Sequence, residues 1–172
     1  MDTSVIQPKF VTDTVGIKIG QSNAPIKLIE FINLRCPFCK KWFTESKEIL
    51  DDALKKGKVQ RVIKLLDKDK ESLQRGNVMH HHVPAQAPDL AYVAIEKIFA
   101  VQDEWAEQSL TDVADYAENK LGLPFCEDQV LSTSIRKEAE QATIQFVPTL
   151  IIGETIFDES LSLEELVQLI EQ

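Results

Sequence analysis

Residues 25–39 constrain the fold of this chain more than any other stretch, because they read as a buried strand that runs directly into a helix. Ile26–Ile32 is mostly apolar and rich in isoleucine, which is typical of a strand covered on both faces. Pro37 has the dihedral angle of a first helical residue and lacks only an N–H that would be unpaired there. The pattern therefore predicts a helix that begins at Pro37, with Cys36 near its N-cap.

Two cysteines stand at this junction. Cys39 follows Cys36 by about one helical turn, which is close enough for a disulfide. A thiolate at Cys36 would lie on the free N–H groups and the positive end of the helix, with Arg35, Lys40 and Lys41 nearby. These neighbours predict a depressed pKa and a thiol that reacts at neutral pH.

The same cysteine spacing also occurs in half of a zinc site. The chain has no second Cys-x-x-Cys and no spaced pair of histidines, which favours redox chemistry and no metal. The adjacent His80, His81 and His82 diverge on a helix or a strand, so we expect them on a solvated helix face or loop. Cys126 follows Leu-Pro-Phe and is expected to be a small buried hydrophobe.

Hydrophobic periodicity predicts an α/β fold around the cysteines. Residues 9–19 alternate weakly and read as an edge strand or hairpin. Apolar residues recur at helical spacing after Cys39 until Gly57 provides a stop, and Val59–Leu66 is a strand rich in branched residues. Strand, helix and strand at this spacing form a right-handed parallel unit, which places the cysteines at the carboxyl end of a strand.

The rest of the chain is helical at first and then returns to the sheet. Helical periods cover 86–102, 110–121 and 127–141. Pro148 predicts the start of a strand or a bulge and argues against a central position, because proline cannot donate to a sheet ladder. Gly153-Glu154 predicts a tight hairpin, and the capping box of Ser162–Glu165 opens a last helix. We thus expect a core of 1–69 and 143–172 with an all-helical insertion at 70–142.

Composition limits the possible partners. The chain has 172 residues, of which 44% are apolar, and 19 basic residues against 28 acidic ones give a formal charge of −9. A net acidic chain without a basic run is a poor candidate for nucleic acid or anionic membranes.

The N-terminal residues lack the basic start and apolar run of a secretory signal, and no stretch is long enough to span a bilayer. The three cysteines include only one suitably spaced pair, which is no structural disulfide framework. We therefore expect a cytoplasmic protein with a catalytic pair. An exported protein whose signal or anchor is absent from this sequence is the alternative.

Three segments together resemble the thioredoxin superfamily of thiol-disulfide oxidoreductases, specifically its disulfide-bond-forming (DsbA-like) branch. They are the strand "IKLIEFINLRCPFC", the late "FVPTLIIGETI" and the helical stretch between them, which cover most of the chain. Cys-x-x-Cys after a strand, followed far downstream by Val-Pro-Thr before another strand, is a specific combination. The resemblance implies a thioredoxin-like fold with a helical insertion beside the active site.

The resemblance also implies roles for single residues. Cys36 would attack a substrate disulfide and Cys39 would resolve the mixed disulfide, with no cofactor beyond this pair. Glu30 would be a buried carboxylate of raised pKa that relays protons to and from Cys39. The alternative is an outward-facing glutamate on a half-exposed strand.

Substrate contacts follow from the same resemblance. Pro37, Phe38, Val147 and Pro148 would contact the substrate, and Val147, beside a cis proline, would bind an extended chain by its backbone. Expected partners are cysteine-containing proteins or peptides and a redox partner protein or glutathione. The most oxidising members of the branch carry histidine where this chain has Phe38, which argues against strong oxidising power. A redox-inactive peptide-binding module and a metal-binding protein are the alternative functions.

Overall fold

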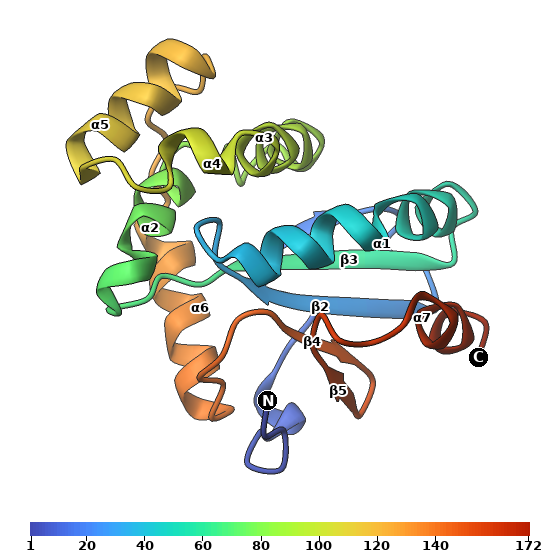
Figure 1. Cartoon of the computed structure of the whole chain (residues 1–172). Helices are drawn as coiled ribbons and strands as arrows, with labels where there is room; N and C mark the ends of the chain where they lie inside the picture. The colour runs from blue at the N-terminus through green and yellow to red at the C-terminus, as the bar shows by residue number, and fades with distance from the viewer.

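The computed structural model describes residues 1–172 and is built on a five-stranded sheet with the order β1-β3-β2-β4-β5 (Figure 1). The central pair, β2 and β3, is parallel, and every other pair is antiparallel. The strands are β1 (Ile17–Ile19), β2 (Ile26–Ile32), β3 (Val59–Leu65), β4 (Thr149–Ile152) and β5 (Thr155–Phe157).

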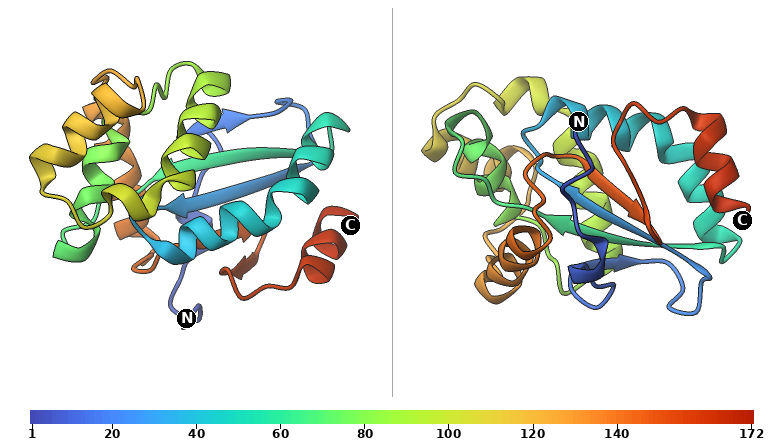
Figure 2. Two further views of the ribbon diagram at one scale, coloured as in Figure 1. Left: turned by 45° about the horizontal axis from the view of Figure 1, so that its top comes forward. Right: turned by 90° about the horizontal axis from the view of Figure 1, so that it is seen from below.

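Seven α-helices surround this sheet (Figures 1 and 2). They are α1 (Pro37–Lys55), α2 (Gln74–His80), α3 (Pro88–Ala100), α4 (Gln102–Trp105), α5 (Leu110–Asp115), α6 (Gln129–Gln141) and α7 (Leu163–Ile170). Short 3-10 turns occur at Pro8–Phe10 and Glu71–Leu73, and α5 continues into a π-helical turn at Tyr116–Lys120. None of the helices combines the length and the apolar content that crossing a bilayer requires.

Side chains of β2 and β3 point alternately to two faces, and each face has its own helices. On one face, Leu28 packs with residues of α1 and α7, and Ile63 packs with residues of α3. On the other face, Phe31 and Val62 pack against α6 and the N-terminal segment. Helices α2 to α6 all lie between β3 and β4 in the chain. Of these, α3 covers one face of the sheet and α6 covers the other.

Most expected elements are present. The strand before the cysteines, the parallel β2-α1-β3 unit, the hairpin at Gly153-Glu154 and the capping box of Ser162 and Glu165 are confirmed. The edge strand expected within 9–19 is confined to Ile17–Ile19.

The expectation that Pro148 keeps its strand away from a central position is wrong. Strand β4 starts directly after Pro148, but it is hydrogen-bonded to β2 on one side and β5 on the other. The proline lies one residue before the ladder, so its missing N–H removes no sheet hydrogen bond.

Candidate active site

The two cysteines lie at the junction between β2 and α1, with Cys36 in the connecting loop and Cys39 in the first turn of α1. Cys36 is the N-cap of α1, with an extended backbone (φ −68°, ψ 121°), and Pro37 is the first helical residue, as the sequence predicts. The carbonyl oxygen of Cys36 accepts the first helical hydrogen bond from Lys40 N–H at 3.1 Å. The Cys36 thiol therefore stands beside N–H groups that the helix leaves unpaired.

The thiols of Cys36 and Cys39 are both free and differ in environment. Cys36 retains 5% of its surface, whereas Cys39 is fully buried and its sulfur accepts a hydrogen bond from Asn33 N–H at 3.5 Å. A hydrogen bond from the Cys39 thiol, with help from the N–H groups of Cys39 and Phe38, lowers the pKa of Cys36 to about 7 despite its burial. Burial, followed by the interaction with Cys36, raises the pKa of Cys39 well above its ordinary value.

The basic neighbours do not contribute as the sequence analysis expects. Arg35 bonds to Glu107 and donates to the Ala106 carbonyl oxygen at 2.8 Å, and Lys40 lies 3.8 Å from Asp103. Both acids belong to the helical segment, so these ion pairs could not be predicted from sequence spacing. No basic side chain is among the groups that shift the pKa of Cys36. The helix N–H groups and Cys39 stabilise the thiolate instead.

The loop before β4 faces the first cysteine. The Val147–Pro148 peptide bond is cis, and the Cys36 thiol lies 3.5 Å from the Val147 carbonyl oxygen. The N–H of Val147 makes no hydrogen bond within the chain. Phe38 and Phe146 expose 56% and 52% of their surfaces. An exposed apolar rim with a free backbone donor thus borders the thiol.

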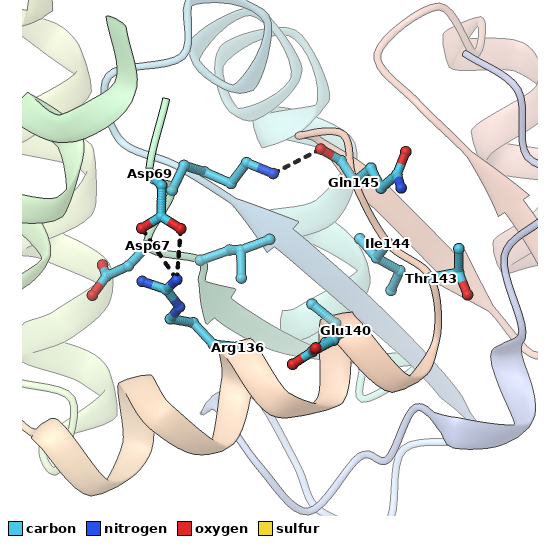
Figure 3. A pocket seen from close by; sticks show the side chains of 10 residues that line it. Asp67, Asp69, Arg136, Glu140, Thr143, Ile144 and Gln145 are labelled. Atoms are coloured by element: carbon cyan, nitrogen blue, oxygen red, sulfur yellow. Dashed lines mark hydrogen bonds and ion pairs between the residues drawn. The ribbon is translucent and has the colours of Figure 1, made fainter. Parts of the chain in front are cut away.

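A surface hollow of about 410 Å³ adjoins this loop (Figure 3). It lies between the end of β3 and the last turns of α6. Lys68 donates to the Gln145 carbonyl oxygen at 2.7 Å, and Arg136 bonds to Asp69 at 3.0 Å. The Lys68 contact ties the β3 end to the segment that leads to Val147.

Glu30 is fully buried, as the resemblance implies, and the alternative of an outward-facing glutamate is wrong. Its carboxylate accepts hydrogen bonds from Trp42 Nε1 at 2.7 Å and from Arg61 Nε and Nη2 at 2.7 and 2.8 Å. No hydrogen bond joins it to Cys39. Arg61 is also fully buried and is a partner that sequence reasoning missed, although a basic residue inside a predicted buried strand is a signal for a buried ion pair.

The loop at residues 33–36 is held by side chains of the helical segment, and of these the sequence analysis names only His80. Asn33 donates to Asn77 at 3.1 Å, and Gln102 donates to the Leu34 carbonyl oxygen at 2.8 Å. Leu34 N–H donates to His80 at 3.2 Å. These contacts connect α2 and α4 to the residues directly before Cys36.

The expectation of solvated histidines is wrong for two of the three. His80 and His82 are buried, because α2 packs its last turn between the sheet and the helices that follow. His80 bonds to Asp67, His82 to the Leu123 carbonyl oxygen, and His81 lies 3.7 Å from Glu127. The three rings thus point to separate partners, and no group of three or more His, Cys, Asp or Glu side chains converges on a metal-sized site.

Cys126 is half-buried rather than buried, because it lies in the irregular segment before α6. Its N–H donates to the His81 carbonyl oxygen at 2.7 Å, and partial burial raises the pKa of its thiol. No hydrogen bond joins the Cys126 thiol to Cys36 or Cys39.

A Cys-x-x-Cys pair at the start of the helix after a central parallel strand, facing a cis-proline loop before an antiparallel hairpin, defines a thioredoxin-fold protein. The sequence model of the family described as Thioredoxin matches residues 12–172. The chain belongs to that family.

Solved structures agree on the fold. A conserved protein of unknown function from Enterococcus faecalis V583 is 56% identical, with a TM-score of 0.98 over 100% of this chain and 98% of that chain. Oxidised BdbD from Bacillus subtilis is 15% identical, with a TM-score of 0.66 over 96% and 94%. A periplasmic thioredoxin-like protein from Salmonella enterica serovar Typhimurium is 18% identical, with a TM-score of 0.67 over 99% and 96%. Comparison with curated proteins gives no match.

Proposed function

We propose that this protein is a thiol-disulfide oxidoreductase that exchanges disulfides with cysteines of proteins or peptides. One observation carries the proposal: the Cys36 thiol, with a pKa lowered to about 7, lies beside the buried Cys39 thiol and 3.5 Å from the Val147 carbonyl oxygen. A thiolate is the attacking species in disulfide exchange, and a thiol with a pKa near ambient pH combines a large thiolate fraction with good nucleophilicity.

The exchange balances without a cofactor. The Cys36 thiolate attacks one sulfur of a substrate disulfide, a mixed disulfide forms, and the other substrate sulfur leaves as a thiolate that takes up a proton. Cys39 then loses its proton and attacks the Cys36 sulfur, which releases the second substrate thiol and leaves a Cys36–Cys39 disulfide. The reverse sequence oxidises a substrate dithiol. The difference in burial supports this order, because Cys36 retains 5% of its surface and Cys39 retains none.

Substrate binding is proposed at the loop before β4. An extended substrate chain would accept a hydrogen bond from the free Val147 N–H and run beside Pro148. The exposed Pro37 and Phe38 would contact the residues around the substrate cysteine. Backbone pairing is tolerant of sequence, so we expect several cysteine-containing substrates. A redox partner protein or glutathione would restore the pair.

Reduction of insulin by dithiothreitol, with and without the protein, tests the function. We expect catalysis by the wild-type chain, none by Cys36→Ser, and a trapped mixed disulfide with Cys39→Ser. Cys126→Ser is the matched control and should keep full activity. Equal activity of wild type and Cys36→Ser would contradict the proposal and would favour a peptide-binding module that needs no thiol.

A further inference from the structure

His80 is a buried, ionisable side chain that the exchange chemistry does not use. It is the last residue of α2, and 8% of its surface is exposed. Its ring lies behind the loop that leads from β2 to Cys36, where its Nε2 is 3.2 Å from the nitrogen of Leu34. The other ring nitrogen, Nδ1, is 2.7 Å from Asp67 Oδ1.

These two contacts fix the protonation of the ring. A backbone N–H can only donate, so Nε2 of His80 must accept from Leu34 and carry no proton. A neutral imidazole then has its proton on Nδ1, which donates to Asp67. Burial lowers the pKa of His80 against the opposing effect of Asp67, which also favours the neutral ring. Asp67 thus selects the tautomer that leaves Nε2 free to accept.

The hydrogen bond from Leu34 N–H to His80 is one of the contacts that hold the loop in place. Its N–H has no other partner, while its carbonyl oxygen accepts from Gln102. Both polar backbone groups of this buried residue are therefore satisfied by side chains of α2 and α4. Loss of an acceptor would leave a buried N–H unpaired, and the loop would move to find another partner. Cys36 follows Leu34 by two residues, so such a movement changes how its thiol meets the first N–H groups of α1.

We propose that His80 is a positioning residue of the redox centre, which acts through Leu34 and is held in the required tautomer by Asp67. This proposal rests on the proposed function, because a positioning role matters only if Cys36 carries out thiol-disulfide exchange. Its test needs no substrate, since it uses a small alkylating reagent. Failure of insulin reduction with normal Cys36 alkylation would count against the function alone, whereas an unaltered thiol in His80 variants would count against the positioning role alone.

His82 provides a matched control. It is buried to 1% exposure next to His80, and its Nδ1 lies 2.9 Å from the Leu123 carbonyl oxygen. It makes no hydrogen bond to residues 33–36. Removal of either ring therefore loses buried packing contacts and lowers stability, but only removal of His80 takes the hydrogen-bond acceptor away from Leu34 N–H.

The experiment measures iodoacetamide alkylation of Cys36 against pH in the reduced full-length chain, with Cys126→Ser as background. We expect His80→Leu to raise the midpoint by about half a pH unit, equal to about threefold slower reaction below it. His80→Gln offers a side-chain oxygen near the Nε2 position and should restore most of the shift. His82→Leu should lower stability without moving the midpoint. An unchanged midpoint in His80→Leu, or an equal shift in His82→Leu, would overturn the proposal.

A measurement on the unaltered chain covers the case in which His80→Leu does not fold. Long-range proton–nitrogen spectra should show His80 at neutral pH with the proton on Nδ1 and none on Nε2. Asp67→Asn can donate to Nδ1 as well as accept from it, so it should admit the other tautomer and shift the Leu34 amide signal. A proton on Nε2 in the wild-type chain would refute the assigned geometry.

Discussion

The Cys36 thiol lies 3.5 Å from the Val147 carbonyl oxygen, although the two residues are 111 positions apart in the sequence. One belongs to the start of α1 and the other to the loop before β4, and the sheet pairing of β2 with β4 brings them together. A substrate that pairs with the Val147 backbone would therefore present its sulfur next to the attacking thiol.

The first prediction concerns the reactivity of Cys36. Alkylation of Cys36 in the reduced protein, in the Cys126→Ser background, should follow a single titration with a midpoint at about pH 7, and Cys39 should remain unmodified because it is fully buried. Mass spectrometry of iodoacetamide-treated protein, digested after quenching, locates the modified thiol. A midpoint at or above that of a free thiol, about 8.5, or faster labelling of Cys39 would contradict the assigned roles.

The same pKa predicts how stability depends on pH. A folded pKa depressed below the unfolded one contributes stability that is present above the unfolded pKa and is lost as pH falls through the folded pKa. The reduced protein should therefore lose stability relative to the oxidised protein as pH falls from about 8.5 through about 7. Urea unfolding of both forms measures this difference. The raised pKa of Cys39 acts with the opposite sign only at higher pH.

Reduced Cys36→Ser is the control for this pH series. It keeps the fold and Cys39 but has no thiolate at position 36. The free energy of unfolding of this variant should not change across the same pH window, once the contribution of other titrating groups is subtracted. The same pH dependence in wild type and variant would mean that a group other than Cys36 causes it.

The second prediction concerns the ion pair of Glu30 and Arg61, both fully buried. Glu30→Gln keeps the shape of the side chain but leaves the Arg61 charge uncompensated, so we expect a loss of about 3–5 kcal/mol in the free energy of unfolding. The double variant Glu30→Gln/Arg61→Met should lose less than the sum of the single losses.

Glu30→Gln also tests the proton relay that the sequence analysis expects of Glu30. A relay requires slower resolution of the mixed disulfide by Cys39, with little effect on the initial attack by Cys36. Stopped-flow measurement of both steps separates them. Reduced stability with an unchanged resolution rate would leave Glu30 a purely structural role.

The third prediction concerns Gly76, at the point where α2 crosses the loop before Cys36. A Cβ atom there would lie 1.8 Å from Asn33 Oδ1 and 2.7 Å from the nitrogen of Arg35. Gly76→Ala should therefore destabilise the protein by about 1–3 kcal/mol, although alanine favours a helix by about 1 kcal/mol. It should also raise the Cys36 alkylation midpoint. Equal or higher stability with an unchanged midpoint would mean that the loop moves freely.

Local patterns in the sequence were sufficient for most of the fold. Ile26–Ile32 and Pro37 define a strand and a helix start through residues that are neighbours in the chain, and Ser162 and Glu165 cap α7 within one turn. The spacing of strand, helix and strand predicts the parallel pairing of β2 with β3. Pro148 led to the wrong expectation that its strand is not central, because a proline prevents a sheet hydrogen bond only through its own missing N–H, and Pro148 lies before the strand.

The environment of the thiols could not be predicted in the same way, because it depends on contacts between distant segments. Glu107 forms an ion pair with Arg35, and Glu30 on β2 forms one with Arg61 on the adjacent β3. The polar segment containing His80 has no strong periodicity, so its burial depends on how α2 packs against residues 33–36. Contacts between residues that are far apart in the sequence leave no pattern among neighbouring residues from which they could be predicted.

The equilibrium potential of the Cys36–Cys39 pair tests the central claim most directly. The protein is equilibrated in buffers of reduced and oxidised glutathione. The fraction of molecules with a Cys36–Cys39 disulfide is then measured by alkylation of the free thiols and mass spectrometry. Because the Cys36 thiolate is stabilised without a cationic neighbour, we predict a potential between about −270 and about −120 mV, within the range of catalytic pairs. A potential more negative than about −300 mV, with the oxidised form much the more stable at neutral pH, would indicate a structural disulfide and contradict the account.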